Sequence, residues 1–388
     1  MVCDAMILER IIVHHVELPF SREFSHARKR RHSAKNIVVE VVADQGNLRG
    51  YGEGAPRPYV TGESQESAVD GVGGFLENSA FPWHVDSVSA IWQFLDGLPR
   101  GKEHNAATCA LEMALLDAFG KSQGRSVMDY FPGDFSTGAI RYGAAIPLGG
   151  DKGISEISAI IKNLGMHHLR IKMGSDIERS RQALKMIRNI FGNENDLRAD
   201  ANCAWSTEVA FEHLALMEEY DVRVIEDPMD PGDSGIAAFS REAGKIGITL
   251  MADESVCSFK DVERAIRKGH FGMVNVRLSK CGGIRKSMKM IDILRRKGLS
   301  FQIGCQLGES GLLSAAGRAL GLLCGDAVYY DGSYDAFLLK ENLTTQNVSF
   351  EAGGKAGPLK GAGLGVSVNR AALERLSNPS KRMRVERH

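Results

Sequence analysis

Five short apolar runs, each ending on a charged residue, recur at a nearly constant interval in the middle of this chain. Their last residues are Lys172, Asp200, Glu226, Asp253 and Arg277, so successive charges lie 28, 26, 27 and 24 positions apart. A strand, a helix and two short loops need about that many residues, because a βαβ unit takes roughly 30. Charged side chains at the ends of successive parallel strands meet at the C-terminal mouth of a (β/α)₈ barrel. The spacing therefore predicts such a barrel, with a functional site at its mouth.

The other barrel strands are expected on either side of this series. Residues 141–147 resemble a first strand, and residues 299–304 and 327–331 continue the alternation after Arg277. Amphipathic helices are predicted between the strands, at residues 176–191, 207–220 and 259–268. The predicted fold class is therefore α/β, a modified (β/α) TIM-type barrel over residues 136–355.

The N-terminal part has a different pattern. Apolar, β-branched runs at 5–18, 36–43 and 48–53 predict three strands of a meander, with a polar, basic loop at 21–33. Residues 64–130 are mainly helical in pattern, and a face of small residues at 105–120 predicts a helix that packs closely against its neighbour. We expect an α+β domain over residues 1–135. A Gly-rich return segment with a frayed basic tail is expected at 356–388 and should pack on that domain.

Composition excludes several classes of partner. Lys and Arg number 48, as do Asp and Glu, so the absence of net charge gives no reason to expect nucleic acid. No apolar run is long enough for a membrane helix, and Asp4, Glu9 and Arg10 interrupt any signal peptide. Seven scattered cysteines without a Cys-x-x-Cys pair are typical of small core residues in a reducing compartment. A cytoplasmic protein is expected.

Three of the strand-end residues are carboxylates. Asp200, Glu226 and Asp253 would project into one mouth, where their mutual repulsion costs stability unless a cation lies among them. Oxygen ligands without His or Cys favour Mg²⁺, with Mn²⁺ as an alternative, over zinc. A single acid at a strand end is more often a helix cap or a salt-bridge partner, but three in succession indicate a metal site.

Lys172 precedes these acids at the second strand, and Arg170 shares its face because side chains alternate along a strand. Positive charge near a lysine disfavours its ammonium form, so Lys172 beside a divalent cation could serve as a general base. Arg170 could orient or tune it. Taken alone, Lys172 would more often be a solvent-facing residue at a strand end.

Several motifs carry a family resemblance. They are RIKMG at 170–174, DANCAW at 200–205, IEDP at 225–228, ADES at 252–255 and KCGG at 280–283. Together with the loop at 52–63 and the segment at 361–365, they make the chain resemble the enolase superfamily. Within it, the chain most resembles the muconate lactonizing enzyme branch, which includes dipeptide epimerases and o-succinylbenzoate synthases.

The resemblance implies that the N-terminal domain caps the barrel with substrate-covering loops. It implies Asp200, Glu226 and Asp253 as Mg²⁺ ligands and Lys172 as a base that removes the α-proton of a carboxylate substrate, forming a metal-stabilised enediolate. Arg170 takes the position of the first lysine in the family's Lys-x-Lys and would be part of the catalytic machinery.

Arg277 departs from the family pattern. The resemblance places a second lysine base at that strand end, on the opposite face of the substrate, but a guanidinium is effectively always protonated. Lys280, three residues on in an expected loop, is a poor substitute. This departure favours one-base lyase or cycloisomerase chemistry, with amino-acid or dipeptide racemisation or epimerisation as the alternative.

Residues expected to bind substrate come from several loops. Glu309 fits an acid after the seventh strand or a helix-start charge, and Asp335 remains from an Asp-x-Asp motif that holds a substrate ammonium in dipeptide epimerases. Arg28 and Tyr59 lie in the expected covering loops. Asn202 and Glu254 follow the metal ligands and should support them.

Two other functional classes remain open. A Schiff-base aldolase would use Lys172 as its nucleophile, and a non-catalytic metal-binding barrel would have lost turnover with the second base. The expected partner is a small-molecule carboxylate substrate, with neither nucleic acid nor membrane. We expect a homo-oligomer, since symmetric assembly is usual for such soluble enzymes.

Overall fold

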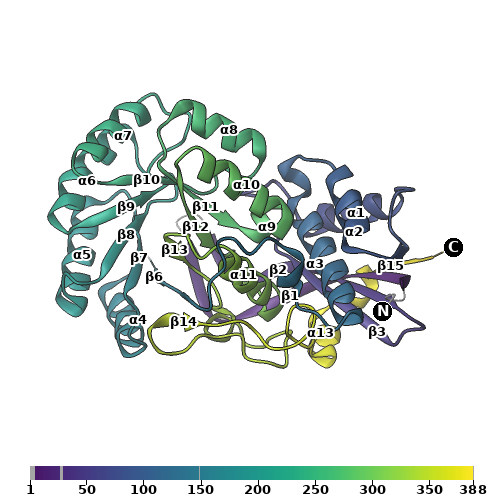
Figure 1. The fold of residues 1–388 in the computed structure, drawn as a ribbon. Helices are drawn as coiled ribbons and strands as arrows, with labels where there is room; N and C mark the ends of the chain where they lie inside the picture. The colour runs from purple at the N-terminus through teal and green to yellow at the C-terminus, as the bar shows by residue number, and fades with distance from the viewer. Residues whose placement is uncertain (1–4, 27–28, 148, 388) are drawn as a thin grey trace.

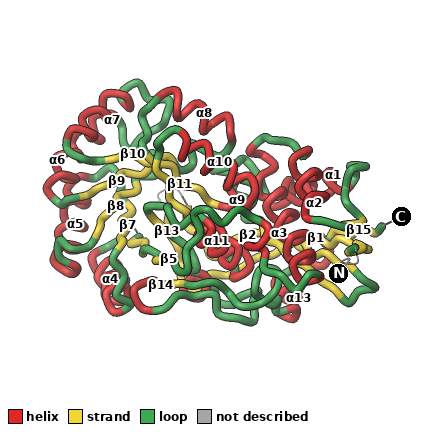
Figure 2. Tube along the Cα trace, viewed as in Figure 1, coloured by secondary structure: helices red, strands yellow, loops and turns green. Residues whose placement is uncertain are grey.

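The computed structural model describes residues 5–26, 29–147 and 149–387. Two large sheets form the framework of the fold (Figure 1). One sheet is antiparallel and built on the N-terminal strands; the other is parallel and curls into a barrel. Figure 2 shows helices around the outside of the barrel strands and a second group of helices beside the antiparallel sheet. The predicted fold class, a TIM-type barrel with an N-terminal α+β domain, is confirmed.

The barrel strands follow one another in chain order. Within the described residues the parallel sheet has eight strands, which are β6 (Ala144–Ile146), β7 (His168–Lys172), β8 (Asp196–Asp200), β9 (Val222–Glu226), β10 (Thr249–Ala252), β11 (Met273–Arg277), β12 (Ser300–Gly304) and β13 (Tyr329–Tyr330). A parallel bridge between Tyr142 and Tyr330 joins the two ends, and the Gly143 N–H donates to the Tyr330 carbonyl at 2.7 Å. The first and last strands are shorter than the sequence pattern predicts.

Helices connect these strands. They are α4 (Asp151–Asn163), α5 (Ile177–Phe191), α6 (Thr207–Glu219), α7 (Ile236–Lys245), α8 (Phe259–Lys268), α9 (Leu278–Cys281), α10 (Ile284–Arg296), α11 (Gly311–Leu323) and α12 (Asp335–Leu338). Local sequence sets their ends: Ser258 caps α8 by accepting from the Asp261 N–H, and Gly269 ends it with a positive φ of 68°. Side-chain caps also start α5, α6 and α11, at Asp176, Ser206 and Ser310.

The N-terminal sheet is built on a long hairpin. Its strands are β1 (Met6–His26), β2 (Lys29–Ala43), β3 (Leu48–Gly54), β4 (His84–Val85) and β15 (Met383–Glu386), and its helices are α1 (Gln65–Leu76), α2 (Val88–Gly97) and α3 (Asn105–Ser122). The basic loop predicted at 21–33 is wrong, because β1 and β2 stay paired as far as His26 and Lys29. Backbone pairing tolerates the polar side chains that made this segment resemble a loop.

Helix α3 packs against β3 at very short range, as its small residues predict. A Cβ added at Gly50, Gly52 or Gly54 would collide with the backbone of α3. Alternate residues of one face of β3 are thus glycine, opposite an alanine-rich helix face. The result is a tight helix–sheet layer that includes residues 52–54, the start of the segment predicted as a loop at 52–63.

The C-terminal segment returns to the N-terminal sheet. After β5 (Ile140–Arg141) pairs with β14 (Lys355–Ala356), the chain forms α13 (Arg370–Leu376) and ends as β15, antiparallel to β1. The predicted frayed tail is therefore wrong for residues 383–386. The domain limits at residues 135 and 355 stay predictions.

In the part of the chain that the structure describes, no helix has the length and apolar character needed to cross a membrane. Six cysteines in these ranges are free, and four of them are buried.

We expect Glu40 to make the N-terminal sheet sensitive to acid. Burial opposes its ionisation, but His14 at 3.0 Å and Arg49 lower the pKa of Glu40 from 4.5 to about 2. Because the folded pKa is depressed, this stabilisation is present above about pH 4.5 and is lost as pH falls toward 2. Glu40→Gln should lose up to about 3 kcal/mol of unfolding free energy at pH 7. Urea unfolding at pH 7 and pH 3 checks this; an equal deficit at both would contradict it.

Candidate active site

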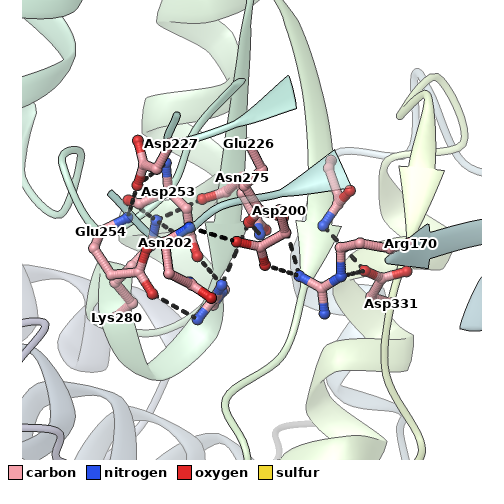
Figure 3. Close-up of polar contacts among 12 residues, drawn as sticks. Arg170, Asp200, Asn202, Glu226, Asp227, Asp253, Glu254, Asn275, Lys280 and Asp331 are labelled. Carbon is pink, nitrogen blue, oxygen red and sulfur yellow. Dashed lines mark hydrogen bonds and ion pairs between the residues drawn. The ribbon is translucent and has the colours of Figure 1, made fainter. Parts of the chain in front are cut away.

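The predicted base and two of the predicted ligands lie side by side at the barrel mouth. In the strand register Lys172 is opposite Asp200, which in turn is opposite Glu226, so the three residues occupy one layer. Asp253 follows β10 directly. Figure 3 shows Asp200, Glu226 and Asp253 gathered in one cluster, and none of these three carboxylates has exposed surface. The repeat thus brings distant acids into one buried cluster.

Two cations from β7 contact this cluster. The Lys172 Nζ lies 2.6 Å from Asp200 Oδ2, and Arg170 Nη1 lies 3.0 Å from Glu226 Oε2 and 3.4 Å from Asp200 Oδ2. Lys172 also donates to Asn202 Oδ1 at 2.7 Å. Arg170 therefore bridges two carboxylates, while the amine of Lys172 is held between Asp200 and Asn202.

Two cations from the other side contact Asp253. Arg277 makes an ion pair with Asp253 and lies 3.5 Å from Glu226 Oε1. Lys280 is fully buried in α9, a helix rather than the expected loop, and all three of its ammonium donors are used: on Asp253 Oδ1 at 3.0 Å and on the carbonyls of Asp253 and Asn275 at 2.6 Å each. Lys280 therefore holds Asp253 in place, and it does not line the cavity described below.

Burial and charge act in opposite directions on these acids. Burial raises the pKa of Asp200, and the neighbouring Glu226 raises it further. Burial also disfavours the ionised form of Glu226, yet Arg170, Arg277 and Lys172 together hold the pKa of Glu226 well below its usual range. In this cluster carboxylates and cationic side chains contact one another, and the cations around Glu226 keep its carboxylate ionised.

The donor set fits a hard divalent cation. Three buried carboxylates supply only oxygen, the ligand type that Mg²⁺ prefers. Asp253 Oδ2 is buried and accepts no hydrogen bond, its contact being the Arg277 ion pair. Within the described ranges no three acids, His or Cys are already arranged around a metal position, and the guanidinium groups of Arg170 and Arg277 lie against the carboxylates. Residue chemistry fits Mg²⁺, and binding requires these guanidinium groups to shift.

Several residues that sequence reasoning missed support the cluster. Asn275 donates to Glu226 Oε1 at 2.8 Å, and Asp331 lies 3.4 Å from Arg170 Nε. Asp227 accepts from the Asp253 and Glu254 N–H groups, which fixes the turn after β10. Asn275 could have been found, because it stands two positions before Arg277 on the same strand face.

Three cations of the cluster, Arg170, Lys172 and Arg277, line a cavity of about 440 Å³, whereas Asp200, Glu226 and Asp253 are not part of its lining. Predicted residues among its lining are Arg170, Lys172, Arg277, Asn202, Glu254, Glu309, Asp335 and Tyr59. Burial raises the pKa of Glu309 to about 8, and its Oε1 accepts from the Gln306 N–H at 2.5 Å. Arg28 lies outside the described residues. The lining is compatible with both substrate and supporting roles, which stay predictions.

The comparisons with known proteins identify the family. The "Enolase C-terminal domain-like" family model matches residues 154–372, more than half of the chain. The chain belongs to the enolase superfamily. The relatives include an epimerase and an o-succinylbenzoate synthase, as the resemblance to the muconate lactonizing enzyme branch implies. The predicted enzyme class, an isomerase or lyase, is confirmed.

Two relatives and one solved structure illustrate the similarity. The L-Ala-D/L-Glu epimerase of Clostridium acetobutylicum is 26% identical, covering 80% of this chain and 86% of its own. The o-succinylbenzoate synthase of Bacillus subtilis is 26% identical, covering 95% and 96%. The structure of a dipeptide epimerase from Enterococcus faecalis with Mg and L-Leu-L-Tyr is 26% identical over 93% of this chain and 99% of that one, with a TM-score of 0.80.

Proposed function

We propose that this chain is a Mg²⁺-dependent racemase or epimerase that removes the α-proton of an amino-acid-derived carboxylate. The observation that carries the proposal is Lys172, whose amine lines the cavity and lies 2.6 Å from Asp200 in a chain of this superfamily. The sequence alone favoured one-base lyase or cycloisomerase chemistry over racemisation or epimerisation. The similarity to epimerases supports placing racemisation or epimerisation first.

Each residue has a distinct role in this proposal. Lys172 takes the α-proton onto Nζ, while Asp200 and Asn202 orient that amine. Asp200, Glu226 and Asp253 would hold Mg²⁺, which when bound supplies Lewis-acid stabilisation of charge on the substrate carboxylate. Arg170 contacts Asp200 and Glu226 and favours the ionised form of Glu226 before the ion binds.

Arg277 supports a second candidate, a one-base lyase or cycloisomerase. Its guanidinium lines the cavity beside Glu226 and donates to Gln306 Oε1 at 3.2 Å. Such a group can stabilise a developing negative charge but accepts a proton poorly. Inversion needs an acid on the face opposite Lys172, so the stereochemical course separates the candidates.

We would test both candidates by α-proton exchange in D₂O. N-acyl amino acids and dipeptides are incubated with enzyme and Mg²⁺, and deuterium and configuration are followed by mass spectrometry and chiral chromatography. Exchange with inversion is expected, and EDTA should abolish it. Exchange with retention would favour the one-base candidate, and no exchange in any substrate would contradict both. Cytoplasmic location and homo-oligomeric assembly stay predictions.

A further inference from the structure

Part of the cavity lining is an apolar wall. Ile157, Ile160 and Ile161 of α4, with Leu164 directly after the helix, lie along one helical stripe and line the cavity. Ile160 on the rim is 45% exposed. A helix stripe of this kind usually faces the core, so its exposure to a cavity indicates an apolar ligand.

A second part of the lining is aromatic. Phe337, 46% exposed, stacks on Phe350 with ring centroids 5.6 Å apart, and Phe350 also packs against Tyr142 and Tyr334. The Tyr334 hydroxyl donates to the Gly143 carbonyl at 2.6 Å, which anchors this aromatic group to the barrel. These contacts hold the aromatic side chains together as one apolar surface. Tyr59, 47% exposed, completes the rim.

Both carboxylate oxygens of Asp335 already accept hydrogen bonds, so Asp335 is poorly suited to bind a substrate cation. Its Oδ1 accepts from the Ser314 hydroxyl at 2.7 Å, and its Oδ2 accepts from Asn342 Nδ2 at 2.5 Å. Only 2% of the residue is exposed. A substrate ammonium would have to break these buried hydrogen bonds to reach the carboxylate, which is costly.

The other two acids among the lining residues also have partners. Glu254 lies 3.9 Å from Arg277 Nη1, and Glu309 accepts from the Gln306 N–H. Burial also raises the pKa of Glu309 to about 8, which reduces its attraction for a cation at neutral pH. The charged end of the cavity therefore suits an anionic group of a ligand, and its apolar wall suits an uncharged part of the same ligand.

We propose that the site takes an N-acyl amino acid whose acyl group is uncharged and apolar, and that this group lies between α4 and the Phe337–Phe350 pair. The substrate carboxylate then points to the Lys172 and Arg277 end. This inference rests on the proposed function, which supplies the α-proton chemistry. A cavity of about 440 Å³ is within the range for a ligand of that size.

The test uses N-acetyl-, N-butanoyl-, N-hexanoyl- and N-octanoyl-alanine together with the free dipeptide Leu-Ala. We expect kcat/KM for exchange to rise about fourfold per buried methylene, and Leu-Ala to be the poorer substrate. Ile160→Glu should flatten the length dependence, mainly through KM. Val328→Glu is the matched control, because Val328 is also 45% exposed but does not line the cavity.

A binding titration separates this inference from the proposed function. N-octanoyl-2-methylalanine and its N-acetyl counterpart have no α-proton, so their dissociation constants report binding alone. Tighter binding of the octanoyl compound, weakened by Ile160→Glu and not by Val328→Glu, supports the inference even if no substrate exchanges. Equal binding of the two compounds, or a preference for Leu-Ala in exchange, overturns it even if the proposed function holds.

Discussion

Lys172→Ala should lower the rate of α-proton exchange by about 10²–10⁴-fold, the range that a positioned general base contributes. The amine of Lys172 lies 2.6 Å from Asp200 and 2.7 Å from Asn202, so it is held at one place in the cavity. Lys172→Arg should be nearly as inactive, because a guanidinium keeps its proton. The measurement is deuterium uptake in D₂O with saturating Mg²⁺.

The controls separate a lost base from a damaged site. Asp200 keeps its contact with Arg170 in either variant, so circular dichroism and urea unfolding should show an intact fold. Lys185→Ala, an exposed lysine on the neighbouring α5, should exchange at the wild-type rate. Near-normal exchange by Lys172→Ala would assign the base to another residue.

The barrel could be predicted because charge and hydrophobicity repeat in phase with its strands. Lys172, Asp200, Glu226 and Arg277 are all the last residues of their strands, as the repeat predicts. The extension of the β1–β2 hairpin to His26 and Lys29 was missed because this segment is basic and polar and lacks the apolar alternation of a half-buried strand. Local signals therefore locate elements best where burial is periodic.

The site could be predicted only in part, for the same physical reason. Acids at strand ends are visible in the sequence, whereas the contacts of Asn275 with Glu226, Lys280 with Asp253 and Asp331 with Arg198 join different elements of the barrel. Asp331 and Arg198 are 133 residues apart yet form an ion pair at 3.0 Å. No spacing rule relates two residues that meet only when the barrel closes.

That pair carries the largest expected effect on stability. Arg198 is fully buried inside the barrel, over the ring of Tyr329, with Asp331 as its counter-ion. Asp331→Leu removes the acid that faces both Arg198 and Arg170, and leaving buried charge unpaired costs about 3–5 kcal/mol.

A double-mutant cycle isolates the pair. We expect Asp331→Leu to lower the unfolding free energy more than Arg198→Met does, because Asp331 keeps Arg170 as a partner in the second variant. The double variant should recover stability relative to Asp331→Leu alone, since replacing both buried charges by apolar groups removes the desolvation penalty. Urea unfolding of the four proteins gives the coupling, expected at about 0.5–3 kcal/mol. Strictly additive losses would mean that Arg170, rather than Arg198, determines the cost of losing Asp331.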